Sequence, residues 1–314
     1  MSGCCGPARG AGDVQGVRPH PAVRPADEAT RRRLRKALVD LPGGTYLAGS
    51  EGPEARSGDG EGPVRPMTVE PFALAPTTVT NRQFAAFVRA TGHVTTAETE
   101  GWSFVPVPLL TPEQRDRVVG VVTETPWWGR VDQTSWRAPW GPGSDVGTLG
   151  DHPVVHVSAH DAAAYCAWAG LRLSTEAEWE LAARGGLEQA RYPWGDELTP
   201  RGRYRCNIWQ GPFPHRNTGD DGWLATAPVK SYGANGLGFF QMAGNVWEWC
   251  ADTWSVGGRA DPGLRVVRGG SFMCHDSYCN RYRVAARTSN TPDSTTSHTG
   301  FRVAASSIGR ILPA

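Results

Sequence analysis

The chain has 314 residues, of which 20% are charged, and a formal net charge of +1 at pH 7. This balance gives no electrostatic reason to expect binding to nucleic acid or to an acidic membrane surface. No stretch approaches the roughly 18 apolar residues of a membrane-spanning helix, and the start of the chain lacks the apolar segment of a signal peptide. We therefore expect a cytoplasmic protein with no nucleic-acid or membrane partner.

The seven cysteines show no paired framework, which agrees with a reducing compartment. Glycine (39) and proline (25) are frequent, but the 13 tryptophans indicate a packed core. Residues 1–33 are rich in Gly, Pro and Arg and predict a disordered N-terminal tail. Residues 34–314 are predicted to form one α+β domain, rich in loops and with little regular secondary structure.

The first ordered elements are expected between residues 34 and 92. A short helix should precede a strand at residues 45–47, and 50–66 should be a loop because of its composition. A strand and then a helix follow within 67–92. Thr80 and Gln83 have the spacing of a capping box, and Gly92 is expected to end this helix.

The middle of the chain predicts two further capped helices. Residues 125–143 show no period and are expected to be a loop held by Trp127, Trp128, Trp136 and Trp140. Residues 152–157 are expected to form a strand, followed by a helix with Ser158 as its N-cap. Another helix should start at Ser174 or Thr175 and stop at Gly185. Only short strands and long loops are expected from there to residue 304.

Cys274 and Cys279 are candidate reactive residues because they lie five positions apart. Five residues of a helix turn through about 500°, so the two side chains would point to different faces. On a strand the odd spacing puts them on opposite faces. Only an irregular loop can therefore bring both sulfurs together. Zinc is disfavoured, because it needs about four ligands and only His275 is nearby. Two inert thiols, a disulfide, a redox couple and a Cu(I) site all remain open.

Oxygen donors gather in two Gly-rich stretches, "CNIWQGPFPHRNTGDDGW" and "GLGFFQMAGNVWEW". Amide, carbonyl and carboxylate oxygens beside turns are the ligands that Ca²⁺ takes. Ordinary Asx-turn hydrogen bonding is the alternative interpretation. The candidate side chains are Asn207, Asp220, Asp221, Gln241, Asn245 and Glu248.

Two further sets of polar residues remain candidates of lower value. Three histidines recur every fourth residue, but the strand-like, proline-broken stretch between them keeps them off one helix face: His152, His156 and His160. Three arginines after the cysteine pair are either solvated or bound to carboxylates: Arg281, Arg283 and Arg287.

Together these stretches resemble the formylglycine-generating enzyme family, also called sulfatase-modifying factors, in its bacterial type. The resemblance rests mainly on "RGGSFMCHDSYCNRYR" and "AARTSNTPDSTTSHTGFR", with support from "NIWQGPFP", "NTGDDG" and "GNVWEW". It implies a loop-rich fold related to C-type lectins, bound calcium and a monomeric protein. The alternative is a non-catalytic, lectin-like binding module of the same superfamily.

The resemblance implies an oxidase that converts the cysteine of a Cys-X-Pro-X-Arg segment to Cα-formylglycine. The implied substrate is an unfolded or nascent sulfatase polypeptide, and the implied co-substrates are O2 and a thiol reductant. By position, Cys274 and Cys279 would bind Cu(I), and Ser271 and Tyr278 would line the reaction pocket. His298 stands at the position of a substrate contact that is Asn in some members.

The resemblance also implies two calcium sites. The first would use Asn207, the Ile208 carbonyl, Asp221 and the Trp223 carbonyl. The second would use Gln241, the carbonyls of Gly244 and Val246, and Glu248.

Overall fold

The computed structural model describes residues 6–8 and 23–307. Six α-helices are present in this part of the chain: α1 (Glu28–Lys36), α2 (Asn81–Thr91), α3 (Thr96–Glu100), α4 (Pro112–Arg115), α5 (Ala159–Ala169) and α6 (Glu176–Arg184). Three short 3₁₀ turns accompany them: η1 (Ser57–Asp59), η2 (Val107–Leu109) and η3 (Pro200–Gly202). Among the described residues, no helix is both long and apolar enough to cross a bilayer.

The strands form four small sheets rather than one large one. The first sheet has the order β1 (Val39–Leu41), β4 (Phe72–Leu74), β13 (Val303–Ser306) and β8 (Arg172–Leu173). The second has the order β11 (Arg287–Asn290), β10 (Arg259–Arg268), β9 (Trp247–Val256) and β12 (Thr299–Phe301). The other two are β2 (Gly44–Ala48) with β3 (Arg65–Val69), and β5 (Trp102–Pro106), β7 (Thr125–Asp132) and β6 (Val118–Val122). The predicted loop-rich α+β class is confirmed.

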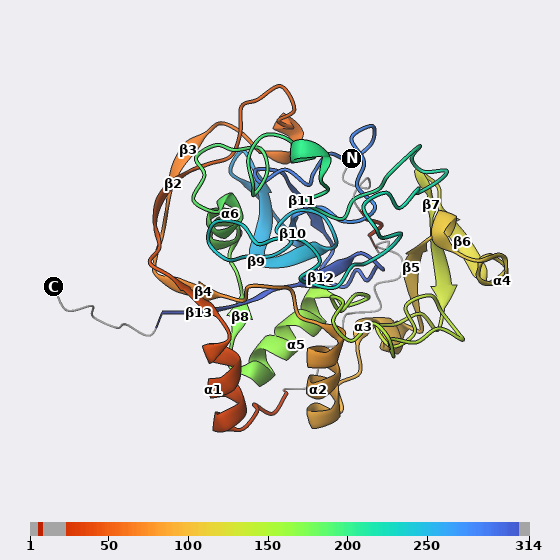
Figure 1. Cartoon of the computed structure of the whole chain (residues 1–314). Helices are drawn as coiled ribbons and strands as arrows, with labels where there is room; N and C mark the ends of the chain where they lie inside the picture. The colour runs from red at the N-terminus through yellow and green to blue at the C-terminus, as the bar shows by residue number, and fades with distance from the viewer. Residues whose placement is uncertain (1–5, 9–22, 308–314) are drawn as a thin grey trace.

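These elements are arranged around the β9–β10 sheet. Figure 1 shows α1, α2 and α5 together on one side of the molecule and the β5–β7–β6 sheet on another. The β9–β12 pair is parallel, whereas the other pairs of the four sheets are antiparallel. Long irregular segments connect the sheets, and they carry most of the candidate residues.

The predicted helix boundaries are confirmed where a side chain caps the first turn. Helices α2, α5 and α6 each start with a complete capping box, and each ends at a glycine in the left-handed conformation. In a capping box the two side chains bond reciprocally to free backbone N–H groups, which fixes the start of the helix locally. The capping pairs are Thr80 with Gln83, Ser158 with Asp161, and Thr175 with Glu178.

Three local predictions are corrected by the structure. The loop expected over 125–143 contains strand β7, because β5 and β6 pair with it from both sides; such pairing depends on tertiary contacts. The strand expected over 152–157 is absent, since His156 has a φ of 59° there. Helix α1 begins at Glu28, inside the range assigned to the tail, because Asp27 caps it by accepting a hydrogen bond from the Thr30 N–H.

Strands β9 and β10 are also longer than the short strands expected after residue 185. Each has ten residues, and Gly257 and Gly258, both with positive φ, form the turn between them. Two consecutive left-handed residues match the twist of the flanking strands, so pairing starts directly beside the turn, with Val256 opposite Arg259. Between Gly186 and Asn245, all of which the structure describes, η3 is the only regular element.

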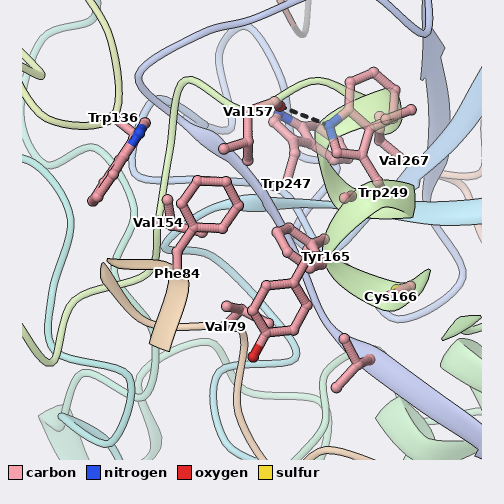
Figure 2. Close-up of a cluster of buried hydrophobic side chains, with 14 of the residues drawn as sticks. Val79, Phe84, Trp136, Val154, Val157, Tyr165, Cys166, Trp247, Trp249 and Val267 are labelled. Carbon is pink, nitrogen blue, oxygen red and sulfur yellow. Dashed lines mark hydrogen bonds between the residues drawn. The ribbon is translucent and has the colours of Figure 1, made fainter. Parts of the chain in front are cut away.

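Buried aromatic side chains hold the irregular segments together. Figure 2 shows part of the largest cluster, in which Phe84 from α2 packs edge-on against Trp136, with ring centroids 5.2 Å apart. Trp249 from β9 lies in the same cluster, and its indole N–H donates to the Val157 carbonyl at 3.0 Å. The cluster also contains Cys274 and Cys279, so the candidate site is built on the core.

Candidate active site

The two candidate cysteines meet in an irregular loop, as their spacing requires. Cys274 and Cys279 are 2% and 1% exposed, and their sulfur atoms lie 3.5 Å apart. This distance is far longer than the roughly 2.05 Å of an S–S bond. Both residues are free thiols, as are the other three cysteines in the described part of the chain. The disulfide interpretation is therefore not what the structure shows.

Tight backbone turns bring these sulfurs together. The Cys274 N–H donates to the Ser271 carbonyl at 2.9 Å, and the Cys279 N–H donates to the His275 carbonyl at 2.6 Å. Before the turns, Gly270 has a φ of 73°, and a Cβ there would lie 2.9 Å from the Tyr282 Cα. Only glycine fits this close approach of two backbones.

The environment of the Cys274 sulfur disfavours a free thiolate. Burial raises the pKa of the Cys274 thiol well above its ordinary value, and the hydrogen bond with Cys279 acts in the same direction. Two donors act in the opposite direction: the Ser271 N–H donates to the Cys274 sulfur at 3.4 Å and lowers its pKa, and an Arg281 N–H approaches the Cys279 sulfur at 3.9 Å. Two nearby thiols in such a place ionise readily only when a cation joins them.

A small pocket opens beside the sulfurs. Its walls are Trp127, Trp128, Trp247, Ser271, Met273, Cys274, Tyr278, Cys279 and His298. Ser271 and Tyr278, which the resemblance names, both lie in this wall, together with three tryptophans. The Trp247 indole nitrogen is buried and has no hydrogen-bond partner within the described part of the chain. An indole N–H in this position can donate to a bound molecule.

Aromatic contacts hold the side chains on both sides of this pocket. The Tyr278 ring lies edge-on to Trp127, with centroids 4.7 Å apart, and stacks on Phe213 at 5.0 Å. On the other side, His298 packs on Trp128 at 4.5 Å, and its Nδ1 lies 2.6 Å from Thr296 Oγ1. The pocket is therefore lined mainly by aromatic rings and has two sulfurs in its wall.

The three arginines of the cysteine loop bind carboxylates and are not solvated. Arg283 forms a two-pronged pair with Glu61, at 2.7 and 2.8 Å, and both side chains are buried. Arg281 binds Asp59 at 2.6 Å, and Arg287 binds Glu176 at 2.6 and 2.7 Å. The loop expected over 50–66 therefore supplies two of the acids that fix the cysteine loop.

The first set of oxygen donors fits a cation. Asn207 is fully buried, and its Oδ1 has no hydrogen-bond partner among the described residues. The Asp221 carboxylate accepts hydrogen bonds from the Ile208 and Trp223 N–H groups at 3.0 and 3.1 Å, which brings all four predicted residues together. Burial raises the pKa of Asp221, and no ion pair within the described part of the chain neutralises it. A bound cation would satisfy both atoms.

The second set of oxygen donors fits a cation poorly. The Gln241 Oε1 is buried without a partner in the part of the chain that the structure describes, as a ligand oxygen would be. However, both oxygens of Glu248 accept hydrogen bonds from Arg302, at 2.8 and 2.9 Å, and one also accepts from Trp179. A carboxylate that already neutralises a buried guanidinium is a poor calcium ligand. The Glu248 carboxylate is thus already engaged, and its role as a calcium ligand stays a prediction.

The other polar candidates have structural roles. Asn245 bonds to Asn207 and to the Ala227 backbone, so it positions the first oxygen set. His156 is buried between Ser103 Oγ and the Pro139 carbonyl, and burial lowers its pKa to about 3. No group of three His, Cys, Asp or Glu residues in the described part of the chain could hold a metal ion.

The chain matches the model of the sulfatase-modifying factor enzyme 1-like domain over residues 24–307. The chain belongs to this family. It is 57% identical to the formylglycine-generating enzyme of Thermomonospora curvata, over 87% of this chain and 95% of that protein. It is also 45% identical to a Bos taurus protein named inactive C-alpha-formylglycine-generating enzyme 2, over 85% of this chain and 87% of that protein.

The solved structure of PvdO from Pseudomonas aeruginosa has a similar fold. The TM-score is 0.61 at 23% identity, with 86% of this chain and 94% of that chain covered. This likeness supports the single α+β domain and nothing about activity. The relation to the C-type lectin fold stays a prediction.

Proposed function

We propose that this protein is an oxidase that converts the cysteine of a Cys-X-Pro-X-Arg segment in a sulfatase polypeptide to Cα-formylglycine. The proposal places O2 as the electron acceptor and a thiol as the co-reductant. The observation that carries it is the pair of buried, unbridged sulfurs, 3.5 Å apart, in the wall of an aromatic pocket. An inert pair of core thiols has no need of a pocket beside it.

The sulfur pair suits Cu(I), because soft thiolates select soft monovalent metals. The fit is supported by the disfavoured ionisation of Cys274, which a bound cation would reverse. When bound, copper would supply the one-electron chemistry toward O2 that no side chain provides.

The residues of the pocket would bind and orient the substrate cysteine. The Arg281 guanidinium and the Ser271 N–H stabilise negative charge on the two protein sulfurs. Trp127, Trp128 and Tyr278 exclude water from the substrate side chain. The buried Trp247 N–H is a donor that the substrate can reach.

The net reaction balances with one external reductant. One cysteine side chain, one O2, two electrons and two protons give one aldehyde, one H2S and one water. Oxidation of the substrate Cβ supplies two electrons, and two thiols that form a disulfide supply the other two. O2 accepts all four.

We further propose a calcium ion at Asn207, Asp221 and the carbonyls of Ile208 and Trp223. Its support is the unpartnered Asn207 Oδ1 near an unneutralised, buried Asp221. In this position the ion would hold the loop that carries Trp209, whose backbone N–H donates to the Cys274 carbonyl at 3.0 Å. The calcium would therefore support the site without joining the reaction.

The substrate we propose is an unfolded or nascent sulfatase chain, bound by a monomer. A five-residue motif can reach buried sulfurs only when it is extended and not yet packed. The alternative is a non-catalytic relative, since the family includes a protein named as inactive. The intact sulfur pair beside a pocket favours the enzyme.

Peptide conversion tests this proposal. A Cys-X-Pro-X-Arg peptide is incubated with the full chain, Cu(I), a thiol and O2, and the products are measured by mass spectrometry. We expect formylglycine at the cysteine and no reaction of the serine peptide, because a hydroxyl is a poor Cu(I) ligand. Replacing the peptide Arg by Ala should cost a few kcal/mol in kcat/KM, of the order expected for a lost charged hydrogen bond. No conversion by copper-loaded protein would contradict the proposal.

A further inference from the structure

Of the three described residues near the start of the chain, Gly6–Ala8, the first two lie against the pocket region. Gly6 and Pro7 are buried there. The Pro7 carbonyl accepts a hydrogen bond from Ser294 Oγ at 2.8 Å and a longer one from Asn290 Nδ2 at 3.4 Å. Ser294 and Asn290 are themselves buried, so two core side chains donate to a residue from the other end of the sequence.

The Gly6 contact brings this segment to the pocket itself. A Cβ built on Gly6 would lie 3.1 Å from His298 Cε1, which is tight contact with a ring that lines the pocket beside Cys274 and Cys279. The described part of this segment therefore ends, on its N-terminal side, against a residue of the pocket wall.

The sequence around these three residues is the proposed substrate motif. Residues 5–9 are Cys-Gly-Pro-Ala-Arg, which matches Cys-X-Pro-X-Arg at all three fixed positions. Of the seven cysteines, Cys5 alone is followed by Pro two positions later and Arg four positions later. The described contacts come from the middle of the motif, whereas Cys5 and Arg9 lie outside the described residues. The motif also precedes residue 24, where the family match begins.

We propose that Cys5–Arg9 is an intramolecular substrate of this protein, and that Cys5 is itself converted to formylglycine. The inference rests on the proposed function for its chemistry, but on the Pro7 and Gly6 contacts for its location. The step is the balanced reaction given above. The Cys5 C–S bond breaks, a C=O bond forms at Cβ, and sulfur leaves as H2S. O2 takes two electrons from Cβ and two from the external thiol.

A second consequence is competition with external substrates. A tethered segment acts at an effective concentration that can reach the millimolar range. The intact chain should therefore bind an external Cys-X-Pro-X-Arg peptide more weakly than a chain whose own motif is broken.

The first experiment maps the modification. The full chain, purified as the thiol form, is loaded with Cu(I) and exposed to O2 and a thiol, with an external Cys-X-Pro-X-Arg peptide in the same tube. Aldehydes are captured with an aminooxy probe and located by peptide mapping. We expect an aldehyde at residue 5 in the wild type and in the matched control Cys4→Ser, and none there in Cys5→Ser. The half-time should not change with protein concentration.

Three results of this experiment would overturn the inference in distinguishable ways. If the external peptide is converted while Cys5 stays a thiol, the inference is wrong and the proposed function stands. If neither is converted, the proposed function fails and the inference fails with it. If conversion of Cys5 speeds up with protein concentration, the reaction is between molecules and the intramolecular assignment is wrong.

The second experiment needs no copper and no turnover. The Kd of a fluorescently labelled Cys-X-Pro-X-Arg peptide is measured by polarisation on copper-free protein, under reducing conditions. Arg9→Ala should bind the probe about tenfold more tightly or better than the wild type, because its own segment no longer competes. Arg18→Ala, a matched arginine outside the motif, should behave as the wild type. Equal Kd values for the wild type and Arg9→Ala would overturn the inference.

Discussion

Two irregular loops of this molecule carry unusual polar atoms, but they are built differently. The cysteine loop, residues 269–283, has its two sulfurs beside a pocket and is fixed from behind by buried arginine–carboxylate pairs. The loop of residues 207–223 turns its oxygens toward its own backbone, where Asp221 bonds to two N–H groups. A reactive site needs space next to its donors, whereas a structural cation site needs donors that close on one another. We therefore expect changes in the first loop to affect turnover and changes in the second to affect stability.

The largest effect is expected from removing either sulfur. Cys274→Ser and Cys279→Ser should each lower turnover at least a hundredfold or so, since even the loss of an outer partner of a metal ligand typically costs 10–100-fold. The rate of peptide conversion with added Cu(I) measures this, and circular dichroism should show the fold intact.

Cys250→Ser is the matched control, because Cys250 is also a fully buried thiol but lies in a different core cluster. Cys250→Ser should lose about as much stability as Cys274→Ser and Cys279→Ser do, but it should keep the turnover of the wild type. Near-normal rates in either loop variant, with copper present, would show that the sulfur pair is not the reaction centre.

The next effect concerns the support of the cysteine loop. Arg283→Met leaves Glu61 buried without its partner, and breaking one side of a buried ion pair typically costs about 3–5 kcal/mol. Arg82→Met is the control, because Arg82 and Asp151 are mostly exposed, and such pairs contribute at most about 1 kcal/mol. Urea unfolding compares the two. An Arg283 variant as stable as the wild type would mean that the carboxylate loop does not anchor the sulfurs.

The stability contributed by the loop of residues 207–223 should depend on calcium and not on copper. Calcium that binds only the folded state adds about 2.7 kcal/mol at a hundredfold excess over its Kd. A chelator should lower the Tm of the wild type, Asp221→Ala should remove most of this difference, and Gln241→Ala should remove less. Identical Tm values with calcium and with chelator would remove the calcium assignment.

The smallest effect is a pH dependence that only the chelated protein should show. Because burial raises the pKa of Asp221, the folded state holds this proton more tightly than the unfolded state does. Its stabilising contribution is present below the ordinary value of 3.8 and is lost as pH rises through the folded pKa. In chelator, wild-type stability should therefore fall relative to Asp221→Asn over this range. With calcium bound, the stability of the wild type should instead rise relative to Asp221→Asn as pH rises.

Local signals in the sequence were sufficient for some of this architecture. The capping boxes of α2, α5 and α6 place helix starts correctly because a cap depends on residues three positions apart. Strand β7 was missed because its partners supply the reason for its extended form. Likewise, the Glu248 pair with Arg302 spans 54 positions, and no local pattern indicates it.

The candidate site shows the same division. The five-residue spacing of Cys274 and Cys279 requires a loop, and the structure has one. Trp127 and Trp128, which form aromatic walls of the pocket, belong to strand β7, far from the cysteines in the sequence. Only the fold reveals that they lie there. The motif at Cys5 is different, because its signal was visible in the sequence as Cys-Gly-Pro-Ala-Arg and needed only comparison with the expected substrate.

The central claim is that the two loop sulfurs form one Cu(I) site, and a copper titration tests it most directly. Copper-free protein in which Cys4 and Cys5 are both replaced by serine is titrated against a coloured Cu(I) chelator. We predict one tightly bound Cu(I) per chain when Cys274 and Cys279 are both present, and loss of tight binding in Cys274→Ser and in Cys279→Ser. One equivalent bound with unchanged affinity by either variant would contradict the account.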